Sequence, residues 1–104
     1  MDDSAAKKGE DNKRVYTYPL LKYCDMHEDM QTEVLELCVT ACEKHSTDNE
    51  AAARFVKETM DKKFGASWHV AVGEGFGFEI TYDINSILYM FCGGNLGLVV
   101  WKCS

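Results

Sequence analysis

The chain has 104 residues, of which 46% are hydrophobic and 27% are charged. This length and composition fit one small globular domain and exclude a multidomain enzyme. Seventeen acidic residues against eleven basic ones give a net charge of −6. Because this is the wrong sign for a surface that follows phosphates, we expect neither nucleic acid nor an anionic membrane as a partner.

The five cysteines are an odd number and none lies in a C-x-x-C pair. This usage indicates reduced thiols in a cytosolic protein rather than a secreted disulfide framework.

Residues 1–13 are polar and show no periodicity. We expect a disordered N-terminal tail, because such a segment buries too little apolar surface to offset its ordering entropy. The predicted domain covers residues 14–104. It opens with the apolar segment 14–24, in which Pro19 lacks an amide hydrogen. A strand here is therefore confined to a sheet edge, or it starts after the proline.

Two amphipathic helices are predicted next. Asp25 with Glu28 three residues later favours a helix capped by Asp25 that runs to about residue 45, and Thr47 with Glu50 favours the start of a second helix. Gly65 occupies the position where a left-handed C′ residue ends this helix. Apolar residues recur at spacings of three and four in both segments, which is typical of helices that pack one face on a core. They are Met26, Met30, Val34, Leu37, Cys38, Ala41 and Cys42, then Ala52, Phe55, Val56, Met60 and Phe64.

After Gly65 the period changes from 3.6 to 2. Residues 68–72 and 76–82 alternate between apolar and other side chains, whereas residues 87–92 and 96–101 are apolar on both faces. These four segments predict an antiparallel sheet. Two helices can cover one face of that sheet, and no remaining segment can cover the other. The pattern therefore predicts an α+β domain that dimerises through its sheet.

Few residues indicate chemistry. Cys38, Cys42 and His45 share one helix face and could form a metal or redox site, although core packing is favoured because a closed zinc site needs a fourth ligand. His69 has no cysteine placed beside it by the sequence, so a nucleophilic pair is not favoured. The segment 76–82 has two open interpretations: an internal strand, or an edge strand that accepts an extended peptide.

Several motifs follow one another in a fixed order: Asp61-Lys62-Lys63-Phe64, Trp68-His69, Val72-Gly73, Phe76-Gly77, Thr81, Tyr89, Gly93 and a terminal aromatic-Lys pair. From about residue 19 to residue 104, this order and spacing resemble the dynein light chain family of the eight-kilodalton type. The resemblance implies two helices on an antiparallel sheet of four to five strands, in a strand-exchanged homodimer. It also implies a non-catalytic hub without a cofactor or bound metal. Such a hub binds short linear motifs of dynein intermediate chains and other partners as an added strand.

The same resemblance implies a role in motor-complex assembly and microtubule-based movement, in the cytoplasm and cytoskeleton, with the ciliary axoneme as one location. The exchanged strand would be residues 76–81. The peptide groove would comprise Glu50, Phe76, Gly77, Phe78, Glu79, Ile80, Thr81, Tyr82, Tyr89, Phe91, Gly97 and Val99. The dimer contact would comprise His69, Thr81 and Lys57, and protonation of facing His69 side chains would weaken the dimer at acid pH.

The chain also departs from the family pattern. Phe78, Glu79 and Tyr82 stand where the common cytoplasmic members have Ser, Tyr and His, and Glu50 stands where those members have a lysine. Because these positions meet the peptide in the family, they put the binding of ordinary glutamine-containing motifs in doubt.

Overall fold

The computed structural model describes residues 19–75, 77–93 and 95–103. The predicted tail at 1–13, the start of the predicted domain at 14–18, and Phe76 lie outside the described residues. The elements follow in the order β1 (Leu20–Cys24), α1 (Glu28–Lys44), α2 (Asn49–Phe64), β2 (Trp68–Glu74), β3 (Leu88–Cys92) and β4 (Leu96–Lys102).

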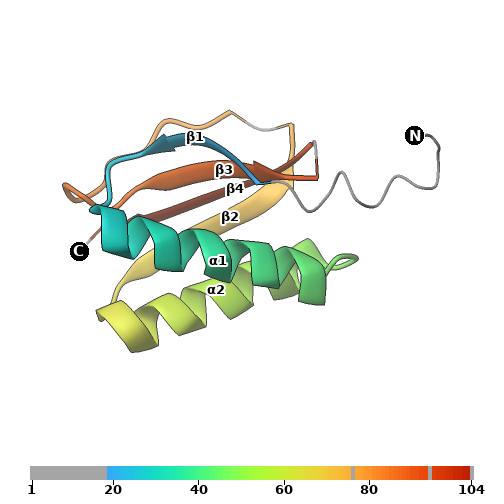
Figure 1. Cartoon of the computed structure of the whole chain (residues 1–104), viewed down its shortest axis with the longest axis horizontal. Coiled ribbons are helices and arrows are strands. Elements are labelled where there is room, and N and C mark those ends of the chain that lie inside the picture. The colour runs from blue at the N-terminus through green and yellow to red at the C-terminus, as the bar shows by residue number, and fades with distance from the viewer. Residues whose placement is uncertain (1–18, 76, 94, 104) are drawn as a thin grey trace.

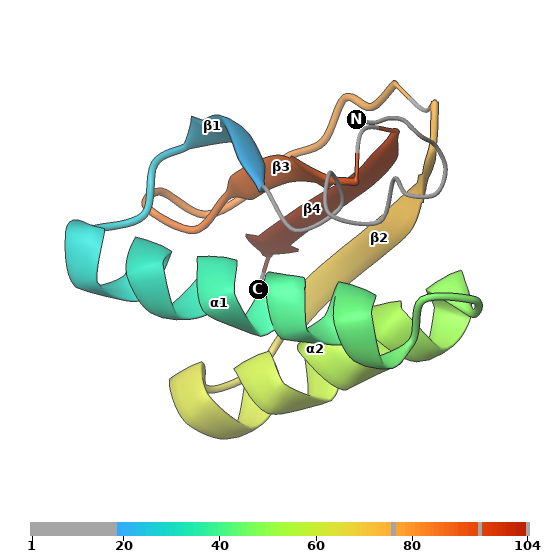
Figure 2. The ribbon, with the colours of Figure 1, turned by 45° about the vertical axis from the view of Figure 1, so that its right-hand side comes forward.

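The four strands form one sheet in the order β1-β3-β4-β2, and every neighbouring pair is antiparallel. Both helices lie on the same face of this sheet, as two views of the ribbon show (Figure 1, Figure 2). The predicted fold class, two helices packed on an antiparallel sheet, is confirmed.

One predicted strand is wrong for the single chain. Residues 77–82 form no ladder with any other described segment, and β1 supplies the fourth strand by pairing with β3. Alternating side chains specify an extended backbone with two unlike faces, but a strand also needs a neighbour with which to exchange hydrogen bonds. Gly75, with a φ of 62°, turns the chain out of β2, and the segment then returns on the side of the sheet away from the helices (Figure 1).

The first strand agrees with the constraint from Pro19. β1 begins at Leu20, directly after the proline, and lies at one edge of the sheet. Only at such a position does the missing amide hydrogen leave no gap in a central ladder. A register shift between Leu21 and Tyr23 marks a bulge in this edge strand.

Asp25 does not cap α1, which corrects the prediction. The N-cap residue is His27, and its side chain makes no capping hydrogen bond. The Asp25 carboxylate instead accepts the backbone N–H of Asn85 at 3.0 Å and that of Ile87 at 2.8 Å. It therefore ties the lead-in to α1 to the turn before β3. The local pattern of a cap is the same whether the carboxylate turns toward the helix or away from it, so the sequence could not separate the two.

The start of α2 is also displaced by one residue from the prediction. Asp48, not Thr47, is the N-cap, and its Oδ1 accepts the N–H of Ala51 at 3.0 Å. A carboxylate outcompetes the neighbouring hydroxyl here because the orphan amides of the first turn favour negative charge. At the other end, Gly65 has the expected positive φ of 80°, but its ψ of 163° extends the chain instead of continuing a left-handed turn.

The core lies between the helices and the inner face of the sheet. Alternate residues of β3 and β4 enter it, and α1 and α2 contribute their apolar stripes. Its fully buried members include Val34, Cys38, Ala41, Val56, Met60, Leu88, Met90, Leu98 and Val100. Neither helix of the described ranges is both long and apolar enough to span a bilayer.

Candidate functional site

The face of the sheet away from the helices, here called the outer face, carries the residues predicted to form the groove floor. Since Leu88, Met90, Leu98 and Val100 point into the core, the residues that alternate with them along β3 and β4 point to the other side. Those residues are Tyr89, Phe91, Gly97 and Val99. The register places Tyr89 opposite Val99 and Phe91 opposite Gly97. The four predicted floor residues therefore form one continuous patch across two adjacent strands.

A row of aromatic rings lies on this patch. The Phe78 ring meets the Tyr89 ring edge-on, with centroids 4.9 Å apart. Tyr89 in turn meets Phe91 at 5.5 Å, and the Lys22 ammonium lies 5.8 Å from the Phe91 centroid. Phe78 nonetheless remains 38% exposed. The row presents apolar ring surface to solvent, and surface of this kind binds apolar side chains of partners.

The segment 77–82 contributes Phe78 to this row while making no strand ladder with the described residues. Gly77, Glu79 and Thr81 are exposed, and Ile80 and Tyr82 are half-buried. A hydrogen bond with Tyr23 raises the pKa of the Tyr82 hydroxyl. The segment ends where the Asp83 N–H donates to the Lys102 carbonyl at 2.8 Å. Phe78 and Tyr82 thus hold the segment through their side chains, and the described strand ladders do not include its backbone.

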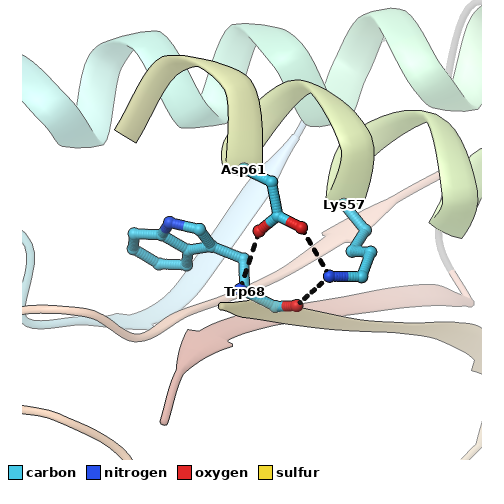
Figure 3. A network of polar contacts seen from close by, with 3 residues as sticks. All are labelled: Lys57, Asp61 and Trp68. Carbon is cyan, nitrogen blue, oxygen red and sulfur yellow. Dashed lines mark hydrogen bonds and ion pairs between the residues drawn. The ribbon is translucent and has the colours of Figure 1, made fainter. Parts of the chain in front are cut away.

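The opposite edge of the sheet is β2, and α2 contacts the first residue of this strand through two charged groups (Figure 3). The Lys57 Nζ donates to Asp61 Oδ2 at 2.6 Å and to the Trp68 carbonyl at 3.0 Å. The Trp68 N–H donates to Asp61 Oδ1 at 2.9 Å. Bonds from Lys57 and from the Trp68 amide lower the pKa of Asp61. Sequence reasoning did not assign Asp61 a role, although its i,i+4 spacing from Lys57 was a visible signal for this pair.

The remaining predicted residues lie in different places. His69 is exposed on β2 and stacks on Trp101 with a centroid distance of 5.5 Å. Their register places them on the same face of the sheet as Val99. Glu50 lies in the first turn of α2, where it pairs with Arg54 at 3.1 Å. Because α2 covers the other face of the sheet (Figure 1), a single chain does not bring Glu50 onto the groove floor.

The cysteine cluster gives the metal and redox alternative no support. Burial raises the pKa of the Cys38 thiol to about 12. A hydrogen bond with Cys92 is the main cause that raises the pKa of the Cys42 thiol, and burial is the second cause. The His45 ring lies 5.7 Å from the Phe55 ring. Protonated thiols are poor metal ligands and poor nucleophiles, and no group of three or more ligating side chains is arranged for a metal within the part of the chain that the structure describes.

Comparison with protein families gives one clear match. The family model described as "Dynein light chain type 1" matches residues 18–103. Proteins named "Dynein axonemal light chain 4" from Homo sapiens and Sus scrofa are 58% identical to this chain over 105 aligned positions, which cover all of both sequences. A protein named "Dynein light chain, cytoplasmic" from Emericella nidulans is 36% identical over 75 residues, covering 72% of this chain and 79% of the relative.

Solved structures share the fold. The dynein light chain-like domain of the Fasciola hepatica calcium binding protein FhCaBP2 superposes with a TM-score of 0.73 over 94% of this chain and all of that one. Its sequence is 17% identical. At this level of identity, the similarity extends to the arrangement of helices and strands alone.

Proposed function

Since the chain belongs to the dynein light chain family, we propose that it is a non-catalytic light chain that assembles dynein motor complexes for movement along microtubules. Its cellular setting is the cytoplasm and cytoskeleton. Identity to axonemal light chains over the full length supports the ciliary axoneme within that setting.

The working unit that we propose is a homodimer in which residues 76–81 of one copy add to the free β2 edge of the other. The observation that carries this proposal is the complementarity of two features of one chain. The segment 77–82 has an alternating sequence and no ladder among the described residues, while β2 ends the sheet. Antiparallel addition satisfies backbone groups on both sides. The outer face, on which Tyr89 and Phe91 are half-buried, then meets its counterpart.

Peptide binding follows from this arrangement. Once the exchanged segment is part of a sheet, its second edge accepts a short linear motif of a partner such as a dynein intermediate chain. Phe78, Ile80 and the outer face supply apolar contacts, and Glu50 and Glu79 supply negative charge near the peptide. Two such grooves on one dimer bind paired partner chains with an avidity set by effective concentration.

The test compares two isoleucines that lie four residues apart. Ile80→Asp places a charge in the proposed exchanged segment, where Ile80 is half-buried, whereas Ile84→Asp changes a side chain that is 84% exposed in the following turn. Sedimentation equilibrium should give a dimer for the wild type and for Ile84→Asp, and a monomer for Ile80→Asp. In titrations with intermediate-chain peptides, the wild type and Ile84→Asp should bind and Ile80→Asp should not. A wild-type monomer that binds no peptide at high micromolar concentration would contradict the proposal.

A further inference from the structure

The direction of the backbone groups along β2 follows from its first residue. Both polar backbone groups of Trp68 bond to α2 side chains. Its register partner Lys102 bonds instead to Ser86 and Asp83. Trp68 and Lys102 are therefore a non-hydrogen-bonded pair, and the groups of Trp68 point away from β4. Because antiparallel pairs alternate in this respect, Val70, Val72 and Glu74 also direct their N–H and C=O groups toward the free edge.

Lys57 and Asp61 thus occupy the first of the four edge-facing positions of β2. Lys57 takes the carbonyl of Trp68 and Asp61 takes its amide, while the two side chains also bond to each other. Figure 3 shows the closed triangle of these three contacts. Both donors to Asp61 favour its ionised form. Charged side chains, lysine in particular, discourage strand pairing where they meet an edge.

We propose that Lys57 and Asp61 form an end-stop that fixes the register of any strand added to β2. The proposal rests on the strand exchange proposed above and adds to it the residues that position the exchanged segment. Because the backbone groups of Trp68 are already hydrogen-bonded to Lys57 and Asp61, an added strand can form ladder bonds only with the edge from Val70 to Glu74. That stretch is five residues long, one fewer than the six described residues of the segment 77–82. The end-stop therefore selects one pairing among those that the repetitive edge would otherwise allow.

The physical reason for a stop lies in the symmetry of strand pairing. Slipping by one residue turns every side chain to the wrong face, so burial already excludes it. Slipping by two residues keeps the faces, so the cost of this slip depends on the cross-strand side-chain pairs and on the ends of the ladder. Because the N–H and C=O groups of Trp68 are already bonded to Asp61 and Lys57, a shifted strand cannot gain extra hydrogen bonds there.

The experiment uses full-length protein and the double variant Lys57→Met/Asp61→Leu. Dimers are prepared with one 15N-labelled and one 13C-labelled copy, and interchain NOEs report which residues of the segment face Val70 and Val72. The wild type should show one set of contacts and none from the Trp68 amide. The double variant should show a second set shifted by two residues, at roughly a tenth or more of the signal, because the two registers then differ by one hydrogen-bonded repeat.

Matched controls separate the end-stop from general effects of charge. The pair Lys63 and Glu33 links α2 to α1 at exposed positions away from the β2 edge, so Lys63→Met/Glu33→Leu should keep the single register. Asp61→Asn retains an oxygen for the Trp68 amide and should do the same. If circular dichroism shows that the double variant is unfolded, Lys57→Met alone frees the Trp68 carbonyl. A shifted register is expected for it as well, at a lower signal because Asp61 still accepts the Trp68 amide.

The outcomes distinguish the two proposals. A dimer whose variant retains one unshifted register overturns the end-stop and leaves the strand exchange intact. A wild type without interchain contacts to β2 overturns both.

Discussion

Asp25 offers the sharpest test of how the tertiary structure uses a residue that the sequence assigned to a helix cap. Its carboxylate accepts two backbone N–H groups, those of Asn85 and Ile87, from the turn that leads into β3. Replacing Asp25 with alanine removes both acceptors. Asn85 is exposed, so water replaces its lost partner, whereas Ile87 is only 3% exposed and its amide is left without one.

The expected cost is the sum of these unequal losses. A buried amide without a partner costs about 1–3 kcal/mol, and the exposed charge-assisted bond contributes about 1 kcal/mol more. Asp25→Ala should therefore lower the free energy of unfolding by about 2–4 kcal/mol. For a domain of this size, such a loss lowers Tm by at least about 8 °C.

The assay is urea unfolding followed by circular dichroism at one fixed protein concentration, because dimer formation would link stability to concentration. Asp25→Ser separates the two roles of the residue. Serine caps helices as well as aspartate does, but its single short hydroxyl does not replace a carboxylate that holds two amides. Asp29→Ala, an exposed change in the first turn of α1, should stay within about 0.5 kcal/mol of the wild type. The reasoning is refuted if Asp25→Ser is as stable as the wild type, or if Asp25→Ala costs less than about 1 kcal/mol.

Two further predictions concern titratable groups. Because the pKa of Asp61 is lowered in the folded state by Lys57 first and the Trp68 amide second, its contribution to stability is present at neutral pH and lost as pH falls through the folded-state value. The difference in unfolding free energy between wild type and Asp61→Asn should therefore shrink on going from neutral to strongly acidic buffer, and a constant difference would contradict this. Burial raises the pKa of the Cys38 thiol to about 12, so iodoacetamide at pH 8 should not alkylate Cys38 in the time in which it alkylates the half-exposed Cys103. Equal labelling of the two cysteines by mass spectrometry would contradict this prediction.

The helices show how far local pattern extends. Apolar spacing of three and four identified both, since a helix satisfies its backbone within one segment and needs only one face of cover. Their caps were displaced, because several neighbouring polar residues carry the same capping signal. Only the three-dimensional positions of Asn85 and Ile87 decide that Asp25 turns away from α1.

The candidate site was likewise predicted only in part from the sequence. The family resemblance assigned Tyr89, Phe91 and Val99 to one groove floor, although their strands are apolar on both faces and show no alternation. The register then set Tyr89 and Val99 opposite each other. Which segment completes the sheet was not in the pattern, since β1 and β3 are distant in sequence and pair through backbone groups that every residue carries.

The sequence by itself determined the fold class, the family and the two amphipathic helices, because all of these depend on periodicity and on motifs within short segments. Tertiary structure alone decided the strand order β1-β3-β4-β2, the role of Asp25 and the occupation of Trp68 by Lys57 and Asp61. These features join residues from separate segments through hydrogen bonds whose partners are fixed only when the helices and the sheet pack together.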